Sequence, residues 1–126
     1  SDYEGAYYGM YFLEVCDYCT RENNDERELL KLLYQSLRAL CAKSLAHELV
    51  RYIFEIKTVA INGEFPGIPN GDKLLESTLY AVSYIVNSPV EKLYTFTVTP
   101  PGRLAAYYCR QSLDGNFKSL EILKSL

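Results

Sequence analysis

The sequence lacks long hydrophobic runs, because its uninterrupted apolar stretches are only a few residues long. It therefore offers neither a membrane-spanning segment nor the apolar centre of a signal peptide. Excess positive charge is also missing, since 13 Lys and Arg residues stand against 16 Asp and Glu residues and give a net charge of -3 at pH 7. Any contact with nucleic acid would have to come from a local basic patch.

Groups suited to catalysis are few. His47 is the only histidine, and no recognisable local motif combines it with a Ser or Cys and an acidic residue. We therefore interpret His47 as a surface or hydrogen-bonded histidine. The carboxylates gather between residues 22 and 28 or stand singly on predicted helix faces, which is typical of capping and solvation. We expect no enzyme active site and no cofactor.

The four cysteines are predicted to be free thiols. Cys16 and Cys19 form a single CxxC pair, but a zinc site needs four ligands, and the other candidates are scattered over different predicted helices: Cys41, His47 and Cys109. A redox pair would need an exposed helix N-terminus, whereas Cys16 and Cys19 lie near the end of a helix on its apolar face. Core packing with reduced thiols is the preferred interpretation, and we expect no metal.

The residues that are present favour one helical domain over residues 1–126. The chain is 48% hydrophobic and 23% charged, and apolar residues recur at helical spacing along most of it. We predict an all-α bundle of about six or seven helices. The predicted segments are about 2–21, 25–41, 44–62, 72–86, 89–93 and 100–111, followed by a short helix near the C-terminus, with 94–99 extended.

The predicted helix at about 44–62 is apolar nearly all round and should be the buried centre of the bundle. Its narrow polar stripe consists of Ser44, Glu48, Arg51, Glu55, Thr58 and Asn62. We expect it to end at Asn62 and Gly63 with a left-handed cap.

For the other helices, the sequence indicates which residues form the apolar face or the N-cap. The apolar stripe of the first helix is Tyr8, Tyr11, Phe12, Val15, Cys16 and Cys19. Asp25 is the predicted N-cap of the second helix, with Glu28 in a capping box. The predicted apolar side of that helix is Leu30, Leu33, Leu37, Leu40 and Cys41. Ser88 is the predicted N-cap of the short helix that begins at Pro89.

Arg51 and the tyrosines each allow two interpretations. With Glu48 and Glu55 on the same face, Arg51 could form an intrahelical ladder of ion pairs. Alternatively, its guanidinium could lie at the floor of a groove and bind a partner's carboxylate through two hydrogen bonds. The 12 tyrosines could stack on nucleic-acid bases, but most occupy apolar helix faces, which favours core packing.

Three stretches resemble a known family, the C-terminal helical domain of the bacterial DNA repair protein RecO. They are Tyr11–Glu14 (YFLE), Leu49–Lys57 (LVRYIFEIK) ahead of Gly63, and Phe117–Leu120 (FKSL). The resemblance implies an N-terminal OB-fold domain that is absent from this chain. Many members carry a cysteine zinc finger after the buried helix. No cysteine lies in the corresponding loop, Glu64–Asp72, so metal binding does not carry over.

The resemblance implies a cytoplasmic, nucleoid-associated recombination mediator of bacteria. Such a protein anneals single strands and, with RecR, helps to load RecA onto DNA coated by single-strand-binding protein, without bond-breaking chemistry. The helical domain would capture the acidic, phenylalanine-ended tail of single-strand-binding protein, and the OB-fold domain would supply most of the DNA contact. The matching basic residues are Arg51 and Lys118 for the partner, with Lys57, Arg103 and Arg110 as further nucleic-acid or partner contacts. The alternative is a helical protein–protein interaction module without a role on DNA.

Overall fold

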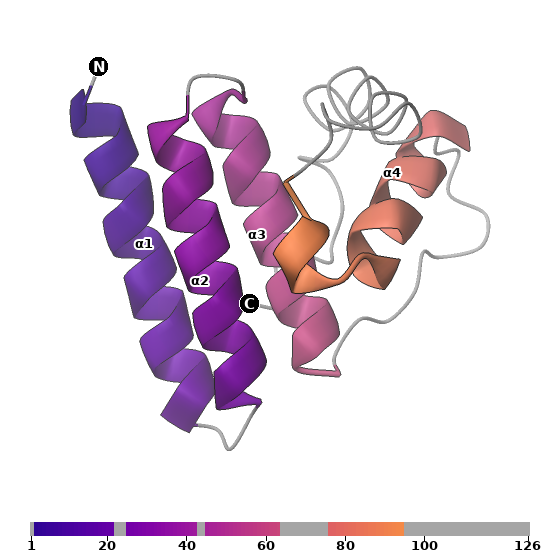
Figure 1. The fold of residues 1–126 in the computed structure, drawn as a ribbon, viewed down its shortest axis with the longest axis horizontal. Coiled ribbons are helices and arrows are strands. Elements are labelled where there is room, and N and C mark those ends of the chain that lie inside the picture. Colours follow the sequence, from indigo (N-terminus) through magenta and orange to yellow (C-terminus); the bar gives the residue numbers. More distant parts are fainter. Residues whose placement is uncertain (1, 22–24, 43–44, 64–75, 95–126) are drawn as a thin grey trace.

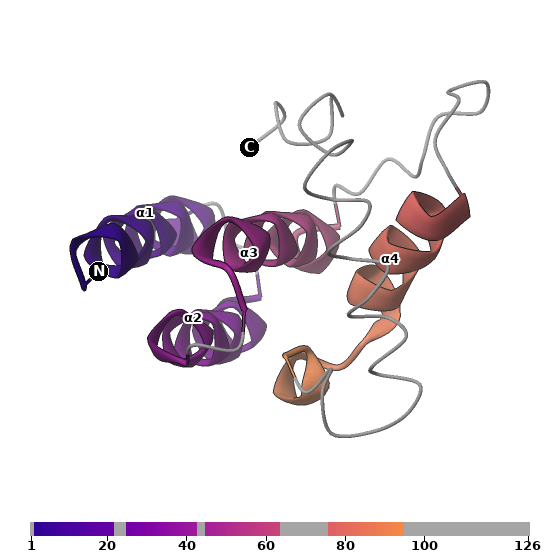
Figure 2. The same cartoon turned by 90° about the horizontal axis from the view of Figure 1, so that it is seen from above.

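A computed structural model describes residues 2–21, 25–42, 45–63 and 76–94. They form the helices α1 (Asp2–Arg21), α2 (Glu26–Cys41), α3 (His47–Ile61) and α4 (Glu76–Asn87), and the 3₁₀-helix η1 (Val90–Lys92). Figure 1 shows α1, α2 and α3 side by side with alternating chain direction. Figure 2 shows α3 in the middle, with α1 and α2 on one side of it and α4 and η1 on the other.

The all-α prediction is confirmed over these residues, which contain no strand. The predicted count of six or seven helices is not supported. The helices expected at about 100–111 and near the C-terminus lie outside the described residues, as does the extended segment after Tyr94. None of the described helices is both long and apolar enough to cross a bilayer.

The prediction of a buried central helix is confirmed. Every residue of α3 from Leu49 to Val59 is buried except Arg51. Phe54 of α3 stacks on Phe12 of α1 with 4.1 Å between the ring centroids, and both side chains are fully buried. This aromatic pair joins the two helices at the core.

The ends of α3 agree with the prediction on one side only. The helix begins at His47 rather than near residue 44, because Ala46 is extended, with φ -64° and ψ 142°, and serves as the N-cap. At the other end, Gly63 has φ 73°, the left-handed conformation that glycine adopts without a side-chain clash. The predicted left-handed cap is thereby confirmed.

The apolar stripe of α1 is confirmed, and that of α2 is confirmed in part, since Leu33, Leu37 and Leu40 lie in or against the core but Leu30 and Cys41 do not. Leu30 is 51% exposed and Cys41 is exposed, whereas the buried residues of α2 are Leu29, Leu32, Ser36, Ala39 and Leu40. Paired leucines at 29–30 and 32–33 make either face look apolar. The contacts of α2 with α1, α3 and η1 shift the centre of the buried face toward Leu29, Leu32 and Ser36, and the Ser36 hydroxyl lies 2.8 Å from the Tyr94 hydroxyl.

Of the two predicted N-caps, one is confirmed. The Asp25 carboxylate accepts a hydrogen bond from the Glu28 backbone N–H at 3.3 Å. The Ser88 prediction is wrong, because Pro89 is the N-cap of η1 and the Ser88 hydroxyl instead donates to the Tyr84 carbonyl in the last turn of α4. A serine directly after a helix can bond back to that helix as readily as forward to the next one.

Candidate partner-binding site

A recess of about 310 Å³ lies where α1 meets α3, lined by Tyr7, Tyr8, Tyr11 and Arg51. The three tyrosines occupy one and a half turns of α1, and Arg51 comes from the first half of α3. Tyr8 and Tyr11 are half-buried, whereas Tyr7 is 74% exposed. We name these four residues the tyrosine–arginine recess.

The Arg51 guanidinium is held from several sides. Its Nε donates to Oε2 of Glu55 at 3.3 Å, and its central carbon lies 5.9 Å from the ring centroids of both Tyr11 and Tyr52. Burial disfavours the charged guanidinium, but the charge and hydrogen bond of Glu55, together with Tyr11 and Tyr52, more than offset that effect, so the pKa of Arg51 lies above its ordinary value. The side chain is still 42% exposed and therefore accessible to a ligand.

The carboxylate behind Arg51 is buried. Glu55 is only 2% exposed, and its Oε2 accepts hydrogen bonds from both the Tyr11 hydroxyl and Arg51 Nε. Burial, together with the hydrogen bond to Glu55 and the charge of Glu55, raises the pKa of Tyr11. Among the described residues, the other oxygen of Glu55, Oε1, has no hydrogen-bond partner. One buried carboxylate thus fixes a donor from α1 and a donor from α3.

The structure gives both interpretations of Arg51 a physical basis. The Arg51–Glu55 half of the predicted ladder is present. Glu48 accepts a hydrogen bond at 2.6 Å from the Tyr52 hydroxyl. Arg51 also forms part of a recess between two helices, as expected for a groove residue.

Of the other basic residues predicted for the site, Lys57 is the one that the structure describes, and it does not line the recess. Lys57, predicted as a nucleic-acid or partner contact, is 7% exposed, and its Nζ donates to the carbonyls of Val86, at 2.8 Å, and Ser88. Burial lowers the pKa of Lys57, a shift that the charges of Glu28 and Glu91 partly oppose. Lys118, Arg103 and Arg110 lie outside the described residues.

Sequence reasoning did not identify the tyrosines or Glu55 as members of the site. Tyr8 and Tyr11 were assigned to the apolar stripe of α1, where they do lie, and Glu55 to the narrow polar stripe of α3 as a possible ion-pair partner of Arg51. The available signal was a carboxylate one turn after an arginine on an otherwise apolar helix, which indicates a buried pair.

A second cavity, of about 750 Å³, lies at the end of the bundle where α1 begins and α2 ends. Here His47 Nδ1 lies 2.8 Å from Glu4 Oε1, and Nε2 lies 3.1 Å from the Leu40 carbonyl oxygen, which confirms a hydrogen-bonded histidine. Cys41 also lines this cavity, whereas Cys16 and Cys19 are buried as predicted. Within the described part of the chain, no three His, Cys, Asp or Glu side chains are grouped so that they could hold a metal ion.

Comparison with known families identifies the family to which the chain belongs. The family model described as "Recombination protein O C terminal" matches residues 1–68, more than half of the 126 residues. The chain belongs to the RecO C-terminal family. No curated protein and no solved structure matches it. The RecO match assigns the chain to DNA recombination and repair, and it includes the whole tyrosine–arginine recess and Glu55.

Proposed function

We propose that this chain is the partner-capturing domain of a RecO-like recombination mediator and carries out no bond-breaking chemistry itself. Its partner would be the acidic, phenylalanine-ended tail of single-strand-binding protein. Strand annealing and RecA loading with RecR would belong to the whole mediator, which acts in the bacterial cytoplasm on nucleoid DNA and contacts it mainly through an OB-fold domain. Lys118 would assist Arg51 in partner binding.

The observation that carries this proposal is the position of Arg51 in a recess walled by tyrosines. A peptide that ends in phenylalanine brings an aromatic ring and a terminal carboxylate close together. The tyrosine rings offer the ring an apolar surface, and a guanidinium can bind a carboxylate with two parallel hydrogen bonds. The Nε contact to Glu55 uses only one of the five N–H donors of Arg51.

The first test is a titration of the domain with an acidic peptide that ends in Asp-Phe. Amide shifts should change around Tyr7, Tyr8, Tyr11 and Arg51. Arg51→Ala should weaken binding by about 1–3 kcal/mol, because it removes a charge-assisted hydrogen bond to the carboxylate.

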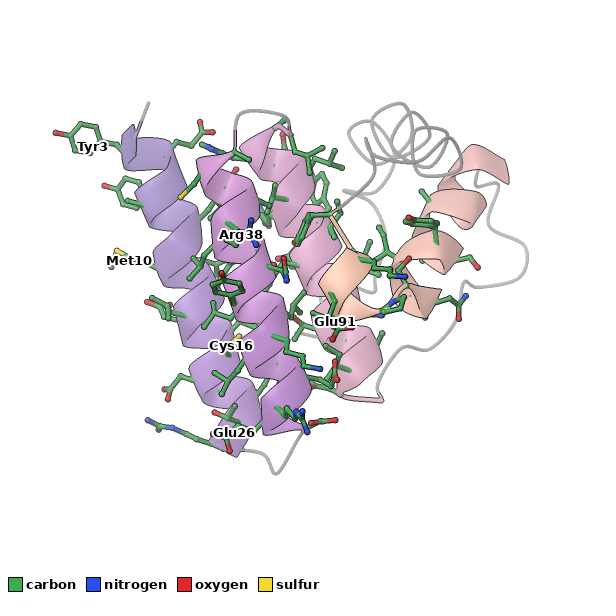
Figure 3. The ribbon with its side chains drawn as sticks, in the orientation of Figure 1. Tyr3, Met10, Cys16, Glu26, Arg38 and Glu91 are labelled. Carbon is green, nitrogen blue, oxygen red and sulfur yellow. The ribbon has the colours of Figure 1, made fainter. Side chains whose placement is uncertain are left out.

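Arg38→Ala is the matched control, because Arg38 lies on the outer face of α2 with its guanidinium carbon 5.6 Å from the Tyr34 ring centroid (Figure 3). It should leave the affinity unchanged. Amidating the C-terminus of the peptide should weaken its binding to the wild-type domain by about as much as Arg51→Ala weakens binding of the free-acid peptide. Unchanged affinity in a folded Arg51→Ala variant would assign Arg51 to the ion pair alone.

A further inference from the structure

The positive charge of Arg51 in the tyrosine–arginine recess is balanced by a buried negative charge on Glu55. Glu55 is a buried carboxylate, 3.3 Å from Arg51 Nε, and its side chain is 3% exposed against 42% for Arg51. The cation therefore faces solvent while its counter-charge lies behind it, out of reach of salt and water. A buried carboxylate is screened far less than a surface one.

The surroundings of the recess are acidic as well. Burial raises the pKa of Tyr8, and the charges of Glu4, Glu48 and Glu55 raise it further, whereas Arg51 alone opposes them. Glu4 lies one turn before Tyr8 on α1, and Glu48 lies one turn before Arg51 on α3. The electrostatic potential at the recess is therefore much less positive than an exposed arginine suggests.

This balance affects different anions differently. A nucleic-acid backbone binds mainly through net positive charge and the counterions that it releases. A single carboxylate on an apolar chain end can instead gain from directed hydrogen bonds and from ring contacts, neither of which requires net charge. A guanidinium that is fixed but largely neutralised favours the second kind of ligand.

We infer that Glu55 is a positioning and selectivity residue: it fixes Arg51 and cancels enough of its charge that the recess takes a carboxylate-bearing apolar chain end and rejects the phosphate backbone of nucleic acid. The inference rests on the proposed function, because it assigns a selectivity to the same recess. Glu55 would act through Arg51 and Tyr11 without touching the ligand.

The experiment compares two labelled probes, an oligo(dT) single strand and the acidic Asp-Phe peptide, by fluorescence anisotropy over a salt series. Glu55→Gln keeps the size and an acceptor oxygen for the Tyr11 hydroxyl but removes the charge. It should raise the oligo(dT) affinity about three- to tenfold at low salt. The slope of the logarithm of the binding constant against the logarithm of salt concentration should become steeper by about 0.7. The ratio of peptide affinity to oligo(dT) affinity should fall by about the same factor.

Glu26→Gln is the matched control, since it makes the same chemical change in the first turn of α2, at the end of the bundle far from where α3 begins (Figure 3). It should change the oligo(dT) affinity less than about twofold, because a distant surface charge is screened. The double variant Arg51→Ala, Glu55→Gln should return to the wild-type oligo(dT) affinity. Equal effects of Glu55→Gln and Glu26→Gln would overturn the inference.

A further measurement does not depend on the folding of the Glu55 variant. In the wild-type background, Arg51→Ala should change the oligo(dT) affinity less than about twofold, because Arg51 is already neutralised. A larger loss would show that Arg51 attracts phosphate and would overturn the inference. Failure of the peptide to bind the wild-type domain would instead overturn the proposed function, and the oligo(dT) arm would still decide the role of Glu55.

Discussion

The three polar residues buried in the second half of α3 are each paired in a different way. Glu55 accepts hydrogen bonds from Tyr11 and Arg51, Lys57 donates to two carbonyls near the end of α4, and the Thr58 hydroxyl donates to the carbonyl of Phe54 at 2.8 Å. A buried charge is tolerated only when it is paired and hydrogen-bonded. Two of these residues therefore bind neighbouring helices to α3, and the third satisfies its hydroxyl locally.

At the residue scale, the burial of the Cys16 thiol leads us to expect a loss of stability at alkaline pH. Burial raises the pKa of the Cys16 thiol from 9.0 to about 11, with a smaller contribution from Cys19. Above pH 9 the unfolded chain ionises at this thiol while the folded chain keeps its proton, so rising pH favours unfolding. The free energy of unfolding should fall by about 1 kcal/mol between pH 9 and pH 10. Urea denaturation at a series of pH values measures it.

The control for Cys16 uses the exposed cysteine. Cys16→Ala should flatten the slope of stability against pH over this window, whatever its effect on stability at pH 7. Cys41→Ser should leave the slope unchanged, because Cys41 is exposed. The same slope in Cys16→Ala as in the wild type would assign the alkaline loss to other groups.

At the element scale, α2 has a strong local signal for its first residue, whereas the apolar pattern along the helix is ambiguous about which face is buried. Asp25 caps the first turn, and Glu26 and Glu28 place negative charge at the positive end of the helix dipole. The adjacent leucines leave the choice of buried face to the contacts with α1, α3 and η1. Local sequence therefore fixes where α2 begins and roughly which side is buried, but not the rotation that leaves Leu30 and Cys41 exposed.

The cap gives the prediction at this scale. Asp25→Ala removes the acceptor for the Glu28 N–H and should lower the free energy of unfolding by about 1 kcal/mol. Asp25→Asn keeps an acceptor oxygen and should retain most of the stability, and urea denaturation at neutral pH compares the two. Equal losses in both variants would attribute the effect to the negative charge of Asp25.

At the scale of the whole molecule, α3 joins two groups of helices. On one side Phe54 stacks on Phe12 of α1. On the other side Lys57 reaches the carbonyls of Val86 and Ser88, where α4 ends and the chain turns into η1. A positive charge is favourable at the C-terminal end of a helix, where carbonyls lack intrahelical donors.

Lys57→Met should therefore weaken the attachment of α4 and η1 to α3. Methionine preserves much of the apolar stem but leaves the two carbonyls without their donor, and the free energy of unfolding should fall by about 2–4 kcal/mol. Hydrogen exchange should become faster in α4 and η1 before it changes in α1. Lys92→Met, at an exposed position in η1, is the control and should change stability by less than about 0.5 kcal/mol. Uniformly faster exchange would contradict a local role for Lys57.

Much of the architecture was predictable because helix signals are local. The spacing of apolar residues located α1 and α3, Asp25 located the start of α2, and Gly63 located the end of α3. Each of these features depends on residues within about a turn of one another. Two of the three stretches that carry the family resemblance lie in α1 and α3, and the match over residues 1–68 confirms the resemblance.

The tyrosine–arginine recess was only partly predictable. Arg51 was singled out from its place on an apolar helix, but the tyrosines and Glu55 that surround it belong to an interface between two helices. Lys57 looked like an exposed cation because nothing near it in the sequence reveals the carbonyls that it binds. Ser36 is buried for a similar reason, since its partner is the hydroxyl of Tyr94.

The sequence by itself determined that the chain is helical, that α3 is its buried centre and that Arg51 stands out on that helix. Only the tertiary structure decided the exact rotation of α2, that Lys57 binds carbonyls inside the molecule and that Glu55 is buried and bonded to Tyr11 as well as to Arg51. The reason is the distance along the chain between interacting groups. Tyr11 and Glu55 are 44 residues apart and Lys57 and Val86 are 29 apart, so their hydrogen bonds exist only once the helices have packed.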